Sequence, residues 1–141
     1  MSVILNKEAL RDFIRTLKPS MAVGTLLSGD RFSCVDEAVG VEADGQIVGV
    51  ATIAPNGEEA SGEPTIVAIY VCHEYRGRGL GRELMIGAVD RCRERGLVPV
   101  RVDALSTSAL RIAQTLPPEY KSDIKLFDLT MGGMTDDLLL M

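Results

Sequence analysis

Several residue types are scarce in this chain, and their scarcity excludes whole classes of protein. The 141 residues include three cysteines, one histidine and no tryptophan. Cys34, Cys72 and Cys92 lack the spacing of a disulfide framework or of a metal-binding motif. We therefore expect no metal site, and reduced, mostly buried thiols of the kind found in cytoplasmic proteins.

Long apolar runs are also missing. A membrane helix needs about 18 to 20 apolar residues in succession, and no segment approaches that length. The N-terminal stretch "MSVILNKEALRDFIRTLK" has too few apolar residues for a signal peptide and carries acidic residues too early. These features predict a cytoplasmic protein with no membrane partner.

A general excess of positive charge is absent as well. The formal net charge is −5 and there are only three phenylalanines, so a nucleic-acid-binding module is not expected. The charge is nevertheless uneven, since seven of the fifteen basic residues fall between Arg76 and Arg101. Acidic residues precede them, at Glu58, Glu59 and Glu63. The length and the hydrophobic content of 46% fit one globular domain over residues 1–141.

The hydrophobic pattern predicts helices and strands that alternate along most of the chain. Residues 20–35 lack a clear period and leave room for a second short helix. Asp44-Gly45 is a strong hairpin signal, and the β-branched run "TIVAIYV" is typical of a strand buried on both faces. The predicted elements are helix 6–18, hairpin 38–54, strand 65–71, helix 80–95, strand 97–104, helix 106–116 and strand 123–131.

This order predicts an α/β or α+β fold with a mixed sheet. Strands 65–71 and 97–104, joined by helix 80–95, should form a right-handed parallel crossover.

The most informative stretch is "VCHEYRGRGLGREL" (71–84), in which Gly77, Gly79 and Gly81 join a strand to a helix. A dinucleotide fingerprint G-x-G-x-x-G would need glycine at Arg82 or Leu84, and the G-K-[ST] of a triphosphate loop is absent. Glycines let the backbone approach a ligand closely, and the first N–H groups of a helix have no internal partner. With the helix dipole and the nearby arginines, this loop predicts a phosphate-binding site.

The segment "IYVCHEYRGRGLGRELMIGAV" resembles the acyl-coenzyme A binding core of the GNAT superfamily of N-acetyltransferases. The family signature [RQ]-x-x-G-x-[GA] is matched by residues 76–81, and the resemblance extends over about 38–116. It implies a GNAT-like fold, with a central, mostly antiparallel sheet in which the parallel strands 65–71 and 97–104 splay apart.

The resemblance also implies where acetyl-coenzyme A (acetyl-CoA) binds. A backbone N–H near the end of strand 65–71 would polarise the thioester carbonyl. The pantetheine arm would pair with Ile69, Tyr70 and Val71, and Ser108 would add a hydrogen bond to it. The pyrophosphate would rest on Arg76, Gly77, Arg78, Gly79, Leu80, Gly81 and Arg82.

Three positions depart from the family pattern. His73 stands where proline is usual, Ser108 replaces an asparagine, and Thr115 falls about where the family has a tyrosine. Threonine cannot serve as the acid that reprotonates the leaving thiolate, so Tyr120 is the nearest candidate for that role. A usual glycine–phenylalanine pair after this helix is missing, and the C-terminal hairpin is reduced to one strand.

Asp103, at the end of strand 97–104, is the first candidate for the general base. The alternative is that Asp103 caps the helix that follows. Glu63, Glu74 and His73 are weaker candidates, because exposed carboxylates and a lone histidine at a strand end are more often simply solvated. Cys72 is expected in the core.

Together these features predict an enzyme that transfers an acetyl group from acetyl-CoA to a primary amine of a small molecule or peptide by direct attack, with a general base. The acidic residues 58–63 favour a cationic acceptor. The alternative is an acetyl-CoA-binding regulatory or sensor domain on the same fold, with weak or no catalysis. The family resemblance is also compatible with a homodimer.

Overall fold

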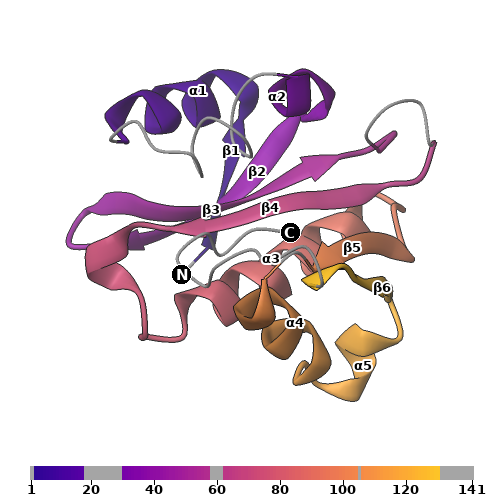
Figure 1. The fold of residues 1–141 in the computed structure, drawn as a ribbon. Coiled ribbons are helices and arrows are strands. Elements are labelled where there is room, and N and C mark those ends of the chain that lie inside the picture. Colours follow the sequence, from indigo (N-terminus) through magenta and orange to yellow (C-terminus); the bar gives the residue numbers. More distant parts are fainter. Residues whose placement is uncertain (1, 18–29, 58–61, 105, 131–141) are drawn as a thin grey trace.

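The computed structural model describes residues 2–17, 30–57, 62–104 and 106–130. Within these residues, six strands form one sheet in the order of the sequence (Figure 1). The strands are β1 (Ser2–Asn6), β2 (Glu37–Ala43), β3 (Gln46–Ala54), β4 (Thr65–Val71), β5 (Val100–Ala104) and β6 (Ile124–Asp128). The helices are α1 (Lys7–Thr16), α2 (Asp30–Cys34), α3 (Leu80–Glu94), α4 (Thr107–Gln114) and α5 (Pro118–Lys121), with a 3₁₀ turn at His73–Tyr75.

The sheet is mixed, as expected. Neighbouring strands from β1 to β4 are antiparallel, whereas β4 and β5, and then β5 and β6, are parallel. The predicted parallel connection from β4 to β5 through α3 is confirmed. A second parallel connection through α4 and α5, which the sequence did not indicate, places β6 beside β5.

The parallel strands β4 and β5 stay together only at their beginnings. Thr65 pairs with Arg101 and Ile66 with Val102, and among the described residues β4 has no strand partner on this side beyond Ile66. On its other side, β4 pairs with β3 along its whole length. The predicted splay is therefore confirmed, and beyond Ile66 it leaves one edge of β4 without a strand partner among the described residues, although β4 lies in the middle of the sheet.

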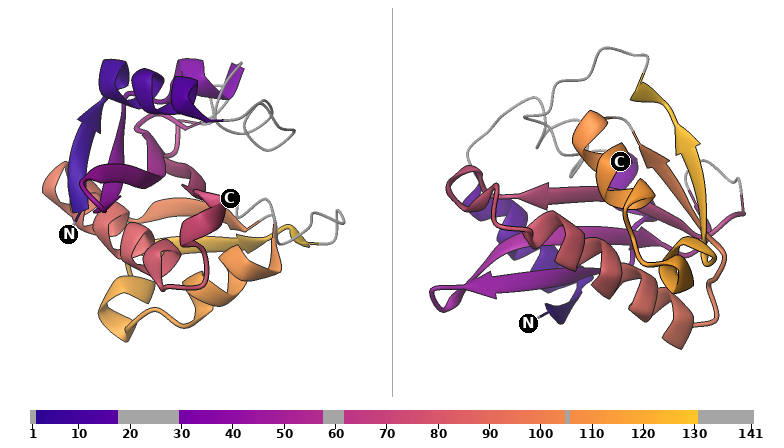
Figure 2. Two further views of the ribbon diagram at one scale, coloured as in Figure 1. Left: turned by 90° about the vertical axis from the view of Figure 1, so that its left-hand side faces the viewer. Right: turned by 90° about the horizontal axis from the view of Figure 1, so that it is seen from below.

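Helices cover both faces of the central strands (Figure 1). On one face α3 and α4 pack against residues such as Ile66, Ile69 and Val102, and Figure 2 shows α3 lying across the sheet on this side. On the other face Leu10 and Phe13 of α1 pack against residues that include Val67. Coverage on both faces explains the continuous apolar run of β4.

Local signals account for several element boundaries. The Asn6 side chain caps α1 by accepting a hydrogen bond from the Ala9 N–H at 2.8 Å. Asp44 and Gly45 both have positive φ, at 53° and 79°, as the two-residue hairpin turn requires. The strand predicted over 97–104 begins only at Val100, after Pro99, which has no N–H to offer a strand partner.

Two elements were not among those expected. β1 was not predicted, because Leu5 fits the helical spacing of α1 but lies in a strand and pairs with Ala38. The helix α5 follows Pro117, with Pro118 at its first position. Most of the region 20–35, the loop 58–61 and the tail after 130 lie outside the described residues. No helix in the described part of the chain could span a membrane.

Candidate active site

A pocket of about 150 Å³ opens where β4 ends and α3 begins. It is lined by Val71, Tyr75, Ile112 and all of the segment 76–82 except Arg78. Residues from β4, the glycine loop, α3 and α4 thus meet at one place. The fold brings the splayed end of β4 and the predicted phosphate loop together.

The three glycines of the loop have two different physical roles. Gly77 and Gly79 both have φ of +80°, in the left-handed region that favours glycine. Gly79 is also the N-cap of α3. Gly81 has no positive φ, but a β-carbon there would lie 3.0 Å from Cδ1 of Ile112. Two glycines therefore shape the loop, and the third lets α4 pack closely against the start of α3.

The loop arginines all bond to carbonyl oxygens of the protein. Arg76 Nε donates to the Val71 oxygen at 2.8 Å. Arg78 donates to the Glu74 oxygen at 3.4 Å, and its guanidinium lies 5.0 Å from the centre of the Tyr75 ring. Arg82 donates to the Thr115 oxygen at 2.7 Å, where α4 ends. The phosphate-binding role of these side chains stays a prediction, and their contacts fix the loop to β4, to its own turn and to α4.

Near the pocket, the backbone N–H and C=O groups of successive β4 residues point alternately toward β3 and toward the gap between β4 and β5. The Cys72 N–H donates to the Val48 oxygen of β3 at 2.8 Å, so Val71, opposite Gly49, belongs to a pair that exchanges no hydrogen bonds. The N–H and C=O groups of Val71, and by the same alternation those of Ile69, point into the gap between β4 and β5. Those of Tyr70 face β3.

Asp103 faces away from α3 and α4. Its neighbours Val102 and Ala104 are buried in the core on that side, so Asp103 and Arg101 point to the other face of the sheet. Arg101 Nε donates to Asp103 Oδ1 at 2.8 Å, and the Asp103 side chain is 20% exposed. The alternative role as a helix cap is wrong, because Ser106 caps α4 by accepting from the Ala109 N–H.

Glu63, a weaker candidate base, is held by two cations. Lys125 contacts it at 3.0 Å and Arg101 at 3.3 Å. Lys125 first, and Arg101 second, hold the pKa of Glu63 below its ordinary value. The neighbouring Glu58 and Glu59, predicted to attract a cationic acceptor, lie outside the described residues. His73 and Glu74 are exposed in the turn before the loop.

The structure does not bring Tyr120 to the pocket. Its ring lies 4.4 Å from the guanidinium of Arg93, in the last turn of α3. The hydrogen bond to Asp90 is the main cause that raises the pKa of Tyr120. At 1.5 Å rise per residue, Arg93 lies about 20 Å along the helix from Gly79. Tyr120 is therefore poorly placed to protonate a thiolate at the splayed end of β4.

The remaining predicted residues lie along α4. Ser108 is half-buried in the first turn of α4 and does not line the pocket, whereas Ile112, one turn later, does. Thr115 follows the last residue of α4 and contacts Arg82.

Sequence reasoning missed Tyr75 and Ile112 as pocket residues. The Tyr75 hydroxyl donates to Asp44 Oδ2 at 2.9 Å, which connects the glycine loop to the turn of the β2–β3 hairpin. In the sequence, the position of Tyr75 directly before Arg76 is a signal that could have indicated its place at the pocket. Ile112 had none, because it belongs to the ordinary apolar stripe of α4.

Known proteins resemble this chain in structure and in sequence. One solved structure, a ribosomal-protein-alanine N-acetyltransferase from Brucella melitensis biovar Abortus 2308, is 22% identical, with a TM-score of 0.45 over 68% of this chain and 73% of that one. No curated protein sequence matches the chain. The model of the acetyltransferase (GNAT) family matches residues 9–114, a range that contains β4, the glycine loop, α3 and α4. The chain therefore belongs to the GNAT family of acetyltransferases, which depend on acetyl-CoA.

Proposed function

We propose that this protein transfers the acetyl group of acetyl-CoA to a primary amine of a small molecule or peptide. The observation that carries the proposal is the meeting of two features at one pocket. On the side toward β5, the backbone groups at the end of β4 pair with no described strand, and beside them lies the glycine loop at the N-terminus of α3.

The residues at this site fit a coenzyme that has a pyrophosphate and an amide-containing arm. Gly77 and Gly79 leave the loop backbone open to close approach, since nothing lies within 4 Å of the positions their β-carbons would occupy. The first N–H groups of α3 favour an anion. Ile69 and Val71 offer the strand-edge groups that a pantetheine arm would pair with. When bound, acetyl-CoA supplies an acetyl group activated as a thioester.

The chain supplies a hydrogen-bond donor and a proton acceptor for the transfer. A backbone N–H near Val71, on the edge of β4 that faces the gap, would stabilise negative charge on the thioester oxygen. Asp103 would accept the proton of the attacking amine, since Arg101 binds only its Oδ1 and no described residue binds Oδ2. Because Asp103 lies on the face of α1 and α2, the acceptor would approach from that face. Ser108 remains a candidate contact for the coenzyme arm.

A thiol-release assay with a panel of amines, polyamines and peptides tests this function. We expect acceptor-dependent release of coenzyme A by the wild type, and a loss of at least about tenfold in kcat for Asp103→Ala. Asp12→Ala, on the exposed surface of α1, is the matched control and should keep the wild-type rate. Failure of every acceptor to raise thiol release above hydrolysis would count against a transferase.

A coenzyme-binding regulatory domain is the second candidate. It is favoured by the position of Tyr120 and by the engagement of Tyr75, the only phenol that lines the pocket among the described residues, with Asp44. This candidate expects acetyl-CoA to bind without acceptor-dependent thiol release. It also expects Asp103→Ala to leave binding unchanged in calorimetry.

A further inference from the structure

Two exposed apolar side chains lie beside Asp103, the candidate general base. Phe127 pairs with Asp103 in the register of β5 and β6, and it is 40% exposed. Leu129, two residues further along the chain, is 44% exposed. In the described part of the chain the only other large apolar residue that is exposed is Ile4, in β1 at the far edge of the sheet. Exposed apolar groups therefore gather next to this carboxylate.

Alternation along β6 places both groups on the same face of the sheet as Asp103. Leu126 packs against the core on the side of α3, so Phe127 and Leu129 point to the opposite face. On that face, the apolar cluster beneath α1 and α2 includes residues of β2, β3 and β4 but none of β5 or β6. The described α1 and α2 therefore leave this face of β5 and β6 uncovered (Figure 1).

The charged groups on this face balance one another. Arg101 Nε donates to Asp103 Oδ1 at 2.8 Å, and its Nη1 donates to Glu63 at 3.3 Å. Lys125 contacts Glu63 at 3.0 Å. The guanidinium of Arg101 lies 4.2 Å from the centre of the Phe127 ring. No group among the described residues bonds to Arg101 Nη2 or to Asp103 Oδ2, so neighbouring side chains keep one donor and one acceptor for a ligand.

This face adjoins the closed end of the gap between β4 and β5. Val102 is the last residue of β5 that pairs with β4, and Asp103 follows it directly. With the pyrophosphate at loop 76–82 and the coenzyme arm along Ile69–Val71, the thioester would lie toward this closed end. An amine that attacks the thioester from the face of Asp103 would extend its other groups over β5 and β6.

We propose that the acceptor is a free α-amino acid with a large apolar side chain. This inference rests on the proposed function and names its acceptor. The amino group would bind Asp103 Oδ2, the carboxylate would bind Arg101 Nη2, and the side chain would lie on Phe127 and Leu129. A guanidinium suits a carboxylate. A polyamine, by contrast, would meet acidic groups whose charge Arg101 and Lys125 already balance.

The transfer of the acetyl group balances with this acceptor. The amino acid arrives with an ammonium group, and Asp103 accepts one of its protons, which frees the nitrogen lone pair. Attack by the nitrogen on the thioester carbonyl carbon forms the C–N bond and breaks the C–S bond, whose electron pair stays on sulfur. A second proton of the nitrogen goes to that sulfur, and Asp103 returns the first to water. The products are the N-acetylamino acid, the thiol of coenzyme A and one proton.

Four acceptors separate the parts of this proposal in a thiol-release assay. L-Leucine carries all three recognised groups. L-Leucinamide lacks the carboxylate, glycine lacks the apolar side chain, and spermidine offers only cationic amines. We expect the wild type to use leucine with a kcat/KM at least about tenfold above that of each of the other three.

Two variants test the residues that would read the acceptor. Arg101→Gln should reduce the preference for leucine over leucinamide to below about threefold, because the charge that binds the carboxylate is lost. Phe127→Ala should reduce the preference for leucine over glycine in the same way. Arg15→Gln removes an exposed cation of α1, and Ile4→Ala removes an exposed apolar side chain of β1. These matched controls should keep both wild-type ratios. Ratios measured within one variant do not depend on how much of it is folded.

Binding of the acceptor is tested separately, without acetyl-CoA, by NMR titration of the ¹⁵N-labelled protein with L-leucine. The amide signals of Asp103, Phe127 and Leu129 should shift with leucine and much less with leucinamide. Arg101→Gln should lose this difference between the two ligands. Equal shifts with leucine and leucinamide in the wild type would contradict recognition of the carboxylate.

Equal use of leucine and leucinamide, or a preference for spermidine, would overturn the inference and leave a transferase in place. Unchanged ratios in both Arg101→Gln and Phe127→Ala would also overturn it, since the acceptor would then be read elsewhere. If acetyl-CoA binds but no acceptor raises thiol release above hydrolysis, the proposed function itself is wrong and the inference falls with it.

Discussion

At the scale of single residues, the glycine loop shows that glycines of one motif can be needed for two different physical reasons. Gly77 and Gly79 are required by backbone conformation, and Gly81 by the close approach of Ile112. A sequence motif records only that a side chain is absent. The structure separates the positions where any side chain strains the backbone from the position where space is the limit.

Gly79→Ala should weaken coenzyme binding through the backbone alone. A non-glycine residue at a φ of +80° costs about 1–2 kcal/mol in stability, and the loop can relieve this strain only by changing the shape of the pocket. Gly45→Ala is the matched control, because Gly45 has a φ of +79° with equally open surroundings but lies in the hairpin turn. We expect similar losses of stability in urea unfolding, and a loss of acetyl-CoA affinity in calorimetry only for Gly79→Ala. Equal affinities would show that the loop does not contact the coenzyme.

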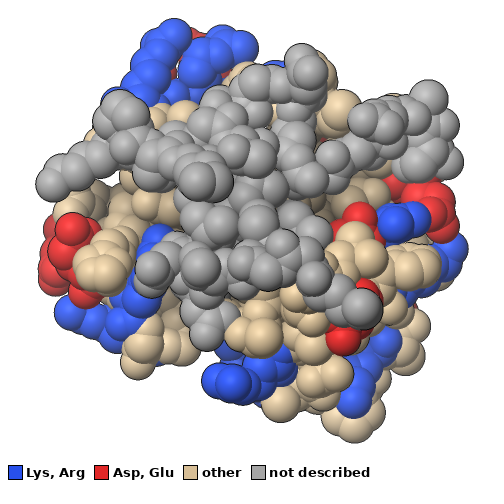
Figure 3. All heavy atoms as spheres, viewed as in Figure 1, with Lys and Arg blue, Asp and Glu red and all other residues tan. Residues whose placement is uncertain are grey.

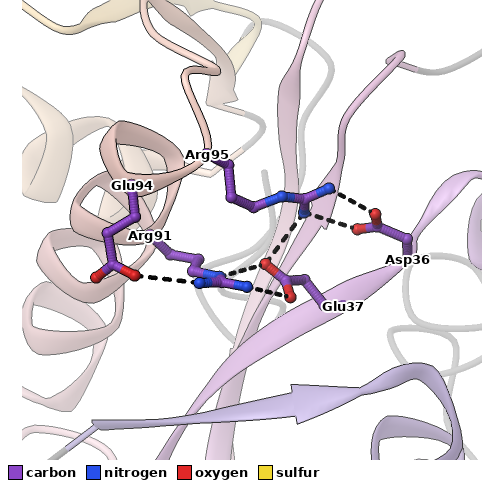
Figure 4. A network of polar contacts seen from close by, with 5 residues as sticks. All are labelled: Asp36, Glu37, Arg91, Glu94 and Arg95. Carbon is purple, nitrogen blue, oxygen red and sulfur yellow. Dashed lines mark hydrogen bonds and ion pairs between the residues drawn. The ribbon is translucent and has the colours of Figure 1, made fainter.

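At the scale of elements, α3 is joined to the sheet by polar contacts at one end. Near its C-terminus, Arg91 makes two hydrogen bonds to Glu37 of β2, at 2.7 and 3.2 Å, and Arg95 makes a third at 3.0 Å (Figure 4). Asp36 also binds Arg95, and Glu94 binds Arg91. The Glu37 side chain is only 12% exposed, whereas that of Asp36 is 45% exposed.

Glu37→Gln should destabilise the protein by about 1–3 kcal/mol, because it leaves two arginines facing a neutral amide in a partly buried setting. Asp36→Asn removes one charge from the same network at a more exposed position. Asp36→Asn should therefore lower the free energy of unfolding by less than about 1 kcal/mol. Chemical denaturation of both variants provides the comparison. Equal effects would show that burial does not distinguish the two carboxylates.

Glu63 ties the segment before β4 to β5 and β6, and its contribution should depend on pH. Lys125 and Arg101 hold its pKa in the folded state below the ordinary value of 4.5. A carboxyl with a depressed pKa stabilises the fold above its unfolded pKa and loses that contribution as the pH falls through the folded value. The difference in stability between wild type and Glu63→Gln should therefore be constant near neutral pH and vanish in acid below 4.5. A difference that persists there would contradict this account.

Elements with strong local signals could be predicted, and those that depend on distant partners could not. The hairpin turn at Asp44-Gly45, the doubly covered β4 and the start of α3 at the glycine loop follow from short stretches of sequence. β1 is a strand because it pairs with β2, more than thirty residues away. The same division holds at the site. The loop and the splay were predictable from the motif, whereas the bond of Arg76 to Val71 and the distant place of Tyr120 depend on packing.

At the scale of the whole molecule, charges of both signs are distributed over the surface. On the face shown in Figure 3, Lys and Arg side chains gather over α1, which carries Lys7, Arg11 and Arg15. Beside the sheet, acidic and basic side chains lie next to one another. Glu63, Arg101 and Lys125 are one such interleaved group.

Binding of acetyl-CoA should stabilise the whole fold, because the site is assembled from β4, α3 and α4 and does not exist in the unfolded chain. At a free ligand concentration about 100 times Kd, the free energy of unfolding should rise by about 2.7 kcal/mol. Thermal unfolding with and without acetyl-CoA measures this rise. Gly79→Ala should show a smaller rise at the same ligand concentration. The absence of any rise for the wild type would contradict binding to the folded state.

The short pairing of β4 with β5 also gives a central strand two kinds of amide. The N–H of Cys72, directly after β4, is bonded to β3, and that of Tyr70 by the same alternation, while those of Ile69 and Val71 point into the gap. In the free protein, the amide hydrogens of Ile69 and Val71 should exchange with deuterium much faster than those of Tyr70 and Cys72, although all four residues lie in the interior of the sheet. A coenzyme arm paired along this edge should remove the alternation. The residue-by-residue exchange pattern of one strand would then report occupancy of the site without any knowledge of the acceptor.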